Sequence, residues 1–164
     1  RPKLIVLDTM NFWMEIAMVD LKKVIQKIDV LTINDEEARL LSGEYSLKKA
    51  AKVILEMGPK YLIIKKGEHG ALLFSGDNIF YAPALPLEEV FDPTGAGDTF
   101  AGGFVGHLST CDEIDWESMK KAIIVGSAMA SFTVEKFGIE RLISLDKSQI
   151  ESRINEFKSL VSFT

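Results

Sequence analysis

The chain has 164 residues, of which 47% are hydrophobic, and its formal net charge is −5. This composition fits one folded domain with a substantial core and excludes a disordered or low-complexity chain. The absence of a basic cluster argues against nucleic acid as the main partner, and no apolar run reaches the roughly 20 residues that a membrane span needs. Cys111 is the single cysteine and there is no signal-peptide pattern, so we expect a cytoplasmic protein that partners neither nucleic acid nor membrane.

Apolar periodicities predict strands and helices in alternation along the chain. In the first third we expect, in order, a buried strand over residues 4–7, a helix over 12–27, a strand over 30–33 and helices over 36–41 and 47–57. Ser42-Gly43 separates the last two helices, and Gly58-Pro59 ends the second of them.

Three strands and then three helices are predicted for the remainder. The strands span 61–65, 71–74 and 79–82, and the helices span 99–108, 116–135 and 147–157, the last after a cap at Ser144 or Asp146. This order predicts a layered α/β domain with a largely parallel sheet, in which ligands gather at the carboxyl ends of strands. Because four polar residues lie at predicted strand ends, we expect them to share one cleft: Asp8, Asn34, Lys65 and Asp92.

A glycine-rich segment precedes the helix expected over 99–108. Gly95 and Gly97 allow backbone conformations that other residues avoid, so successive N–H groups at the helix start can point at one anion, which the helix dipole also favours. An aspartate beside a bound phosphate would be repelled by it, unless the aspartate takes a proton from an attacking hydroxyl group. Asp98 stands at that place, which indicates phosphoryl transfer.

The same segment also has a purely structural explanation, in which it is a tight strand-to-helix turn capped by Asp98. Two other phosphate-binding motifs do not fit. The dinucleotide fingerprint needs a third glycine where this chain has Phe100, and the P-loop needs a Gly-Lys-Ser/Thr ending that is absent. A phosphate bound here would be held mainly by backbone amides and the helix dipole.

A second polar segment follows the strand over 30–33. Asn34 and Glu37 would place an amide and a carboxylate at a strand end, an arrangement that suits Mg²⁺ because this ion keeps several of its waters. The alternative is that Asn34 or Asp35 caps a helix and that Glu36 and Glu37 fill its first turn.

A third segment begins where the strand over 61–65 ends. On local pattern, Lys65 and Lys66 are a solvated pair at the strand end, and Gly67 to Gly70 form a hairpin turn into the next strand. That structural role is compatible with a position beside a ligand.

In this order, the segments resemble the ribokinase-like carbohydrate kinases, the PfkB family. The second signature of that family reads Asp-Thr-x-Gly-Ala-Gly-Asp-x-Phe, and residues 92–100 read Asp-Pro-Thr-Gly-Ala-Gly-Asp-Thr-Phe. Pro93 is the one departure and is a common variant in the family. The resemblance implies an anion hole over the transferring phosphate formed by Gly95, Ala96 and Gly97, with Asp98 as the catalytic base.

The resemblance also implies positions that bind the nucleotide and its ions. Asp92 and Thr94 match positions that help to hold an activating monovalent cation, for which K⁺ is the candidate. Glu37 matches the glutamate of the family's Asn-x-x-Glu motif and would act on Mg²⁺ through water. The implied nucleotide-binding residues are Asn34, Lys65, Gly67, Gly70, Ser127 and Gly138. Small residues around Ser127 are equally explained by close helix packing.

By this resemblance the whole chain, residues 1–164, is the C-terminal, nucleotide-binding part of a ribokinase-like layered α/β/α fold. It opens with Arg1-Pro2 directly ahead of a buried strand. We therefore expect the N-terminal half with its lid to be absent and the chain to be inactive alone. Because a half sheet exposes an edge and an apolar face, we also expect a homo-oligomer or association with the missing half.

The function implied is an ATP-dependent, Mg²⁺-requiring kinase that phosphorylates a hydroxyl group of a sugar or nucleoside. The segment over 8–13 departs from the sugar-kinase pattern, so the acceptor stays open between these two classes. The rival is a non-catalytic, nucleotide-binding regulatory module. Asp98, present together with Asn34 and Glu37, argues against that rival because a pure binder needs no base.

Overall fold

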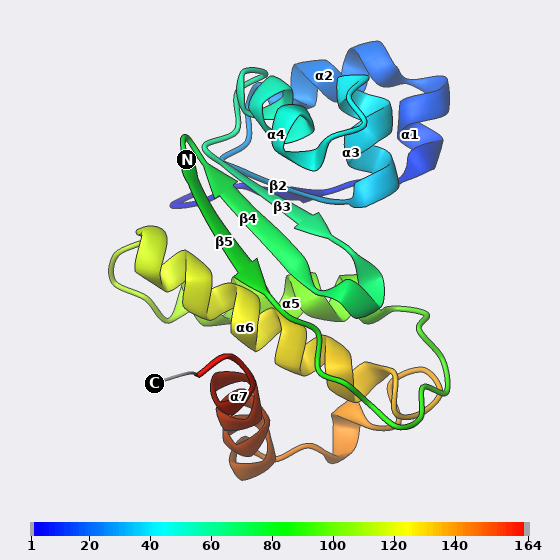
Figure 1. Ribbon diagram of the computed structural model, residues 1–164, viewed down its shortest axis with the longest axis vertical. Helices are drawn as coiled ribbons and strands as arrows, with labels where there is room; N and C mark the ends of the chain where they lie inside the picture. The colour runs from blue at the N-terminus through cyan, green and yellow to red at the C-terminus, as the bar shows by residue number, and fades with distance from the viewer. Residues whose placement is uncertain (1, 163–164) are drawn as a thin grey trace. The chain divides into compact units, whose positions relative to one another are not determined.

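The computed structural model describes residues 2–162, in two compact units (Figure 1). The first unit runs to Gly67 and resumes over Ala71–Tyr81, and the second holds Glu68–Gly70 and the described residues from Ala82 onward. Arg1, on which the expectation of a missing N-terminal half partly rests, lies outside the described residues. Each unit is described by itself.

A mixed sheet organises the first unit. Its strands lie in the order β1-β2-β3-β4-β5, with the bounds β1 Val6–Asp8, β2 Val30–Asn34, β3 Tyr61–Lys65, β4 Ala71–Ser75 and β5 Asn78–Ala82. β1, β2 and β3 run parallel to one another, whereas β4 runs antiparallel to β3. Residues 66–70 join these two strands directly, and a connection so short permits only an antiparallel pair. The α/β class with a mostly parallel sheet is confirmed.

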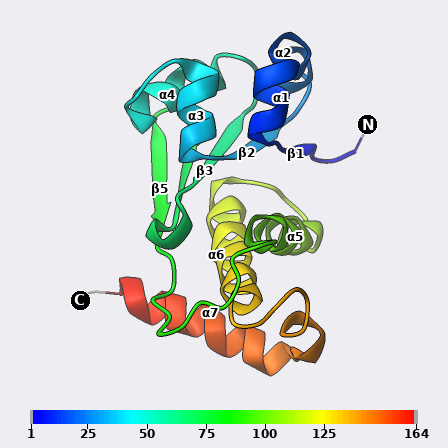
Figure 2. The same cartoon turned by 90° about the vertical axis from the view of Figure 1, so that its right-hand side faces the viewer.

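The helices α1 (Asn11–Ile16), α2 (Met18–Ile25), α3 and α4 cover one face of this sheet (Figure 2). α3 (Asp35–Ser42) and α4 (Leu47–Leu55) follow β2, and α3 contacts β2 and β3 while α4 contacts β3. The buried side chains that these helices and strands share with α2 include Leu21, Ile25, Leu31, Ile33, Leu41, Ile54, Leu62 and Ile64. This apolar layer is the core of the first unit and the reason that β2 and β3 read as nearly continuous apolar runs.

The single helix predicted over 12–27 is wrong. Two helices occupy the segment, α1 (Asn11–Ile16) and α2 (Met18–Ile25), because the backbone of Ala17 leaves the helical region with φ of −142° and ψ of 33°. The N–H of Ala17 still donates to the carbonyl of Trp13, so the break preserves the hydrogen bond at its N-terminal side. The apolar periodicity continues across Ala17. A periodic pattern cannot reveal a change of backbone angle at one residue, so the sequence did not predict the break.

The strand-end polar residues lie together at one edge of the sheet. Asp8, Asn34 and Lys65 are the last residues of β1, β2 and β3, and Asn34 is in register with Lys65. Ile33 and Ile64 belong to the core under the helices, so the alternation of side chains along a strand places their neighbours Asn34 and Lys65 on the opposite face.

Helices make up most of the second unit. They are α5 (Ala96–Ser109), α6 (Trp116–Thr133) and α7 (Lys147–Val161), with short 3₁₀ turns at Gly67–His69 (η1) and Leu142–Ser144 (η2). α7 begins after Asp146, whose carboxylate accepts the N–H of Gln149, so the second of the two predicted caps is confirmed. Among residues 2–162, no helix combines the length and apolar character needed to cross a membrane.

α5 and α6 lie in close contact in the second unit, and glycine makes that contact possible. A Cβ on Gly126 would lie 2.7 Å from the carbonyl oxygen of Phe100 and 3.1 Å from its ring. A Cβ on Gly103 would lie 3.2 Å from the Cα of Gly126. Close helix packing therefore explains the small residues around Ser127, as the alternative reading of the sequence proposed.

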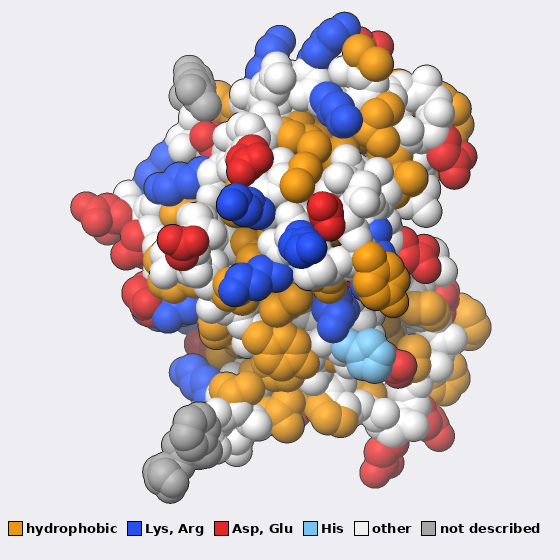
Figure 3. Space-filling model, turned by 45° about the horizontal axis from the view of Figure 1, so that its top comes forward, with side chains coloured by type: hydrophobic (Ala, Val, Ile, Leu, Met, Phe, Trp, Pro, Cys, Tyr) orange, Lys and Arg blue, Asp and Glu red, His pale blue; other side chains and the backbone are white. Residues whose placement is uncertain are grey.

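Large hydrophobic side chains also reach the surface among the charged ones (Figure 3). In the first unit they include Ile16 on α1 and Val19 on α2. Scattered apolar side chains are ordinary on protein surfaces. Association through them, with a second copy or with an N-terminal half, stays a prediction.

The close contact of α5 and α6 predicts opposite effects of alanine at two glycines. Gly126→Ala should lower the free energy of unfolding by about 1 to 3 kcal/mol, because the new methyl group meets the backbone of Phe100. Gly102→Ala in α5 has open space around its Cβ and should raise it by about 0.5 to 1 kcal/mol through helix propensity. Urea unfolding of the two variants measures both, and similar effects at both positions would contradict the packing argument.

Candidate functional site

A partly buried ion pair connects the first and third strands of the sheet. Nζ of Lys65 lies 2.8 Å from Oδ2 and 3.1 Å from Oδ1 of Asp8, so it donates to both carboxylate oxygens. Because β2 lies between β1 and β3, the pair crosses over the end of the middle strand. The solvated role that local pattern gives Lys65 is wrong, since this ammonium group is held at a fixed place above the carboxyl ends of the strands.

Asn34 and Glu37 form a reciprocal cap at the start of α3. Oδ1 of Asn34 accepts the N–H of Glu37 at 2.7 Å, and Oε2 of Glu37 accepts the N–H of Asn34 at 2.9 Å. The capping explanation is therefore confirmed for Asn34, and the alternative cap Asp35 is the first helical residue instead. The role of Asn34 and Glu37 toward Mg²⁺ stays a prediction.

The carboxyl group of Glu37 lies in an unusual environment for an acid. The residue is only 5% exposed. Burial raises the pKa of Glu37 above its ordinary value, although the hydrogen bond from Asn34 and the positive charge of Lys65 oppose this rise. The negative charge of Asp8 adds to the rise. The ionisation of Glu37 thus depends on the ion pair next to it.

Two buried hydroxyl groups near Asp8 were not among the residues that sequence reasoning selected. Oγ1 of Thr9 and Oγ1 of Thr32 are buried and have no hydrogen-bond partner among the described residues. Thr9 follows Asp8 directly, and Thr32 is in register with it on β2. Buried polar groups are nearly always paired, so two buried hydroxyl groups without a partner in the described part of the chain make the surroundings of Asp8 an unusual polar position within an apolar sheet. The only feature of the sequence that could have indicated these hydroxyl groups was a threonine inside the apolar run of β2.

The glycines after β3 have the backbone role expected of a hairpin turn. Gly67 and Gly70 have φ of +55° and +81°, in the left-handed region that favours glycine. A Cβ on Gly70 would also collide with the backbone of Ala82. The hairpin explanation is confirmed, and nucleotide binding at these two positions stays a prediction.

The second unit holds the glycine-rich turn, and here two expectations are wrong. Asp92 does not end a strand, because β5 ends at Ala82 and the intervening residues form no strand. Asp98 does not cap the helix: α5 begins at Ala96, three residues before the predicted start, and its N-cap is Gly95 with φ of +81°. The left-handed cap lets the first turn include Asp98, whose side chain is exposed.

The start of α5 differs from the capped helices of this chain. At α3, α6 and α7, the side chain of the N-cap residue accepts a first-turn N–H group. No N-cap side chain accepts an N–H group at α5, and the same is true of α1, α2 and α4; what sets α5 apart is its left-handed glycine N-cap. The N–H of Ala96 donates to the carbonyl of Pro93 at 3.1 Å. The next N–H groups of the first turn, those of Gly97 and Asp98, have no partner within the helix and lie at the positive end of the helix dipole.

Asp92 is organised by the turn that precedes this helix. Its Oδ1 accepts the N–H of Thr94 at 2.9 Å. Hydrogen bonds from the backbone and side chain of Thr94 lower the pKa of Asp92, so its carboxylate is ionised at neutral pH. The carboxylate of Asp92 and the hydroxyl group of Thr94 are oxygen groups of the kind that hard cations take as ligands. Among the described residues no group of three or more His, Cys, Asp or Glu forms a metal site.

The loop after α6 meets the segment before this turn. The N–H of Phe91 donates to the carbonyl of Val134 at 2.8 Å, and the rings of Phe91 and Phe137 make an edge-to-face contact. Gly138 follows with φ of +53°. Within the second unit, the structure thus brings the Gly138 loop to the Asp92 turn. The expectation of one cleft shared with Asp8, Asn34 and Lys65 involves both units and stays a prediction.

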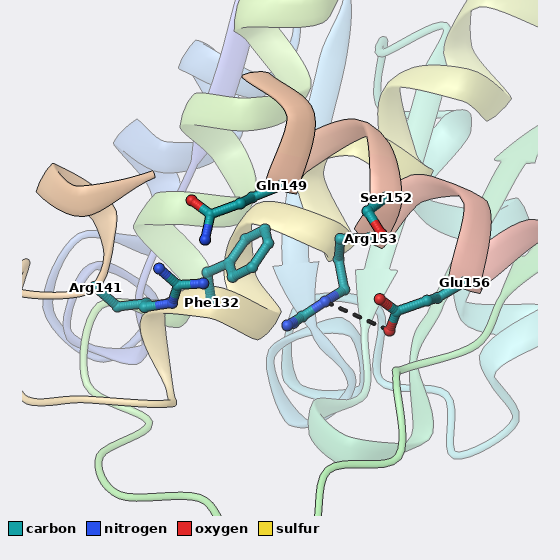
Figure 4. A pocket seen from close by; sticks show the side chains of 6 residues that line it. All are labelled: Phe132, Arg141, Gln149, Ser152, Arg153 and Glu156. Carbon is teal, nitrogen blue, oxygen red and sulfur yellow. Dashed lines mark ion pairs between the residues drawn. The ribbon is translucent and has the colours of Figure 1, made fainter. Parts of the chain in front are cut away.

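Two arginines, Arg141 and Arg153, hold the same loop through their hydrogen bonds to Glu135. They line a shallow cavity of about 190 Å³ together with Phe132, Gln149, Ser152 and Glu156 (Figure 4). The guanidinium carbons of Arg141 and Arg153 lie 5.1 Å and 4.0 Å from the centre of the Phe132 ring. Glu135 accepts from Nε of Arg141 at 2.9 Å and from Nη2 of Arg153 at 2.6 Å. No motif in the sequence indicated this network.

Comparison with known proteins gives a consistent set of relatives. A model of the pfkB family carbohydrate kinases matches residues 3–144. The chain is 32% identical over 120 residues to the cytidine kinase of Thermococcus kodakarensis, covering 72% of this chain and 41% of that protein. It is 33% identical over 123 residues to the ribokinase of Staphylococcus aureus, covering 72% and 39%.

A solved structure shares the fold. The aminoimidazole riboside kinase from Salmonella enterica, complexed with aminoimidazole riboside and an ATP analog, superposes with a TM-score of 0.77. The sequence identity is 24%, and the match covers 91% of this chain and 51% of that structure. The fold is therefore ribokinase-like, and this chain spans about half or less of the length of the relatives it matches.

The Asp8–Lys65 ion pair predicts an energetic coupling between its two residues. Asp8→Asn and Lys65→Met should each lower the free energy of unfolding, with a coupling of about 1 to 2 kcal/mol in a double-mutant cycle, because the pair is mostly buried. Asp20→Asn and Lys23→Met form a matched cycle at an exposed pair and should couple by only about 0 to 0.5 kcal/mol. Equal coupling in both cycles would contradict the structural role of the buried pair.

The Glu135 network predicts a pH-dependent stability. Burial of the Glu135 carboxyl group raises its pKa, but hydrogen bonds from Arg153 and Arg141 outweigh burial and lower the pKa below the ordinary 4.5. The stabilisation is thus complete above about pH 4.5 and is lost as the pH falls through the lower pKa of the folded state.

The substitution Glu135→Gln tests whether this stabilisation is lost as the pH falls. The variant should be less stable than the wild type by about 1 kcal/mol at pH 7, after allowance for solvent screening. The difference should shrink as unfolding is measured toward pH 3. A difference that stays constant from pH 7 to pH 3 would show that the charge of Glu135 does not contribute.

Proposed function

The chain belongs to the pfkB family of carbohydrate kinases, and from this premise we propose that it is the C-terminal, phosphate-binding part of a kinase that phosphorylates a sugar or a nucleoside. A cytidine kinase and a ribokinase are among its relatives, so both acceptor classes are represented. The ATP analog bound to the structural neighbour supports ATP as the phosphoryl donor. The proposal concerns the natural protein that contains this chain.

The observation that carries the proposal is the left-handed glycine turn at the start of α5. Gly95 adopts the left-handed conformation, and no side chain accepts the N–H groups of the first turn. Such donors, at the positive end of a helix of 14 residues, are suited to an anion. Gly95, Ala96 and Gly97 would surround the phosphoryl group as it is transferred, and would stabilise the charge that develops on its oxygens.

Asp98 is proposed as the general base. Its exposed carboxylate lies in the first turn of α5, beside the proposed phosphate position. It would accept the proton of the acceptor hydroxyl group while that oxygen forms a bond to the γ-phosphorus and the bond from phosphorus to the β,γ-bridging oxygen breaks, releasing ADP. An aspartate beside a bound phosphate is unfavourable unless it has such a task.

The polar residues of the first unit are proposed to act at the nucleotide. Asp8 holds Lys65 in one side-chain conformation, so its ammonium group would already be in position to contact the nucleotide phosphates. Asn34 and Glu37 hold each other and would orient water around Mg²⁺, which neutralises phosphate charge when it is bound. Gly67 and Gly70 would let the backbone turn beside the nucleotide.

The remaining positions lie in the second unit. The ionised carboxylate of Asp92, with Thr94, is proposed to hold a monovalent cation, with K⁺ as the candidate. Ser127 lies next to Gly126, whose backbone meets Phe100 of α5. Ser127 and Gly138 are proposed to line the nucleotide side of this region. The bound cation would shield the phosphate charge close to the start of α5.

Asp98→Asn tests the proposed base. In the natural protein, turnover with Mg-ATP should fall by about 10²- to 10⁴-fold on the preferred acceptor, because the hydroxyl proton loses its acceptor. ATP affinity, measured by calorimetry, should stay nearly unchanged. Asp77→Asn, at an exposed turn between β4 and β5, is the matched control and should keep full turnover. Cytidine, ribose and fructose serve as the first acceptors.

Two outcomes would contradict this assignment. Near-normal turnover in Asp98→Asn would remove Asp98 from the chemistry. ATP binding by the wild type without transfer to any sugar or nucleoside would favour a non-catalytic, nucleotide-binding regulatory module.

A further inference from the structure

Two contacts tie the loop after α6 to the segment before α5. The N–H of Phe91 donates to the carbonyl of Val134 at 2.8 Å. The rings of Phe91 and Phe137 lie 6.5 Å apart between centres at an angle of 71°, which is the edge-to-face arrangement that aromatic pairs prefer. We call Phe91, Val134 and Phe137 the aromatic clasp.

The rings of the clasp are not part of the hydrophobic core. Phe91 is 59% exposed and Phe137 is 63% exposed. Because neither ring is enclosed by other residues, their mutual contact contributes mainly to the relative position of the two loops that carry them.

The clasp lies directly beside residues with proposed roles in phosphoryl transfer. Phe91 is followed by Asp92, whose carboxylate accepts the N–H of Thr94, and the next residue is the left-handed cap Gly95. One hydrogen-bonded turn therefore separates Phe91 from the start of α5, so a shift of Phe91 would also shift the start of the helix.

The other side of the clasp is anchored independently. Glu135 follows Val134 and is held by Arg141 and Arg153 at hydrogen-bond distance. Phe137 therefore extends from a loop whose base is fixed, and can act as a support for Phe91.

We propose that Phe137 is a positioning residue, which through Phe91 holds the turn of Asp92 and Thr94 in the geometry that binds the monovalent cation and presents the anion hole. This inference rests on the proposed function of that turn. The ring of Phe137 contacts the ring of Phe91, so its proposed effect is on geometry and not on chemistry.

Phe137→Ala in the natural protein tests the proposal. The K⁺ concentration for half-maximal activation should rise about threefold to tenfold and kcat should fall by a similar factor, as the loss of one aromatic pair predicts. The KM of the acceptor should stay unchanged. Phe137→Tyr keeps the ring and should restore both values. Ile143→Ala removes another exposed apolar side chain, 76% exposed in η2, and should change neither value.

A second readout does not require activity. In amide NMR spectra of this chain, Phe137→Ala should shift the resonances of Thr94 and Gly95, while resonances of the sheet in the first unit stay in place. Shifts that stop at Phe91 and do not reach Thr94 would overturn the proposal, whether or not the natural protein is an active kinase. Unchanged K⁺ activation and kcat in an active Phe137→Ala protein, or an equal loss in Ile143→Ala, would also overturn it. An inactive wild type would instead contradict the proposed function, and the NMR result would then decide this inference alone.

Discussion

The close contact between α5 and α6 is the constraint on which the candidate phosphate site depends. Gly126 lets the backbone of α6 approach the carbonyl of Phe100, one turn after the start of α5. A side chain at Gly126 would push the helices apart and displace the turn at Gly95 from the loop that follows α6. The close packing of α6 and the position of the start of α5 are thus two consequences of one contact.

Charge organises the strand ends of the first unit. Lys65 is shared between the two oxygens of Asp8, while its positive charge also favours ionisation of Glu37, against the burial that disfavours it. A lysine held by a carboxylate keeps its ammonium group in place, and the negative charge of the carboxylate offsets its positive charge. This arrangement suits binding of a strongly anionic ligand, which can compete for the ammonium group, better than binding of a neutral one.

Much of the fold followed from the sequence because the core of the first unit has strong periodic patterns. β3 was predicted with its exact bounds and β2 to within one residue, since both are apolar runs closed by a polar residue. The misplaced features are set by single backbone angles: Ala17 divides a helix, and Gly95 starts α5 three residues early. The ion pair of Lys65 and the Glu135 network join residues far apart in sequence, so no local pattern could predict them.

Phosphate binding at the start of α5 is tested most directly by the amide NMR spectrum of the chain, recorded during titration with Mg-ADP. We predict that the largest shifts occur at the amides of Gly95, Gly97 and Asp98, because no N-cap side chain accepts the N–H groups at this helix start, where an anion is favoured. Binding that leaves these amides unchanged while resonances elsewhere move would contradict the central claim, and would make the start of α5 a structural turn only.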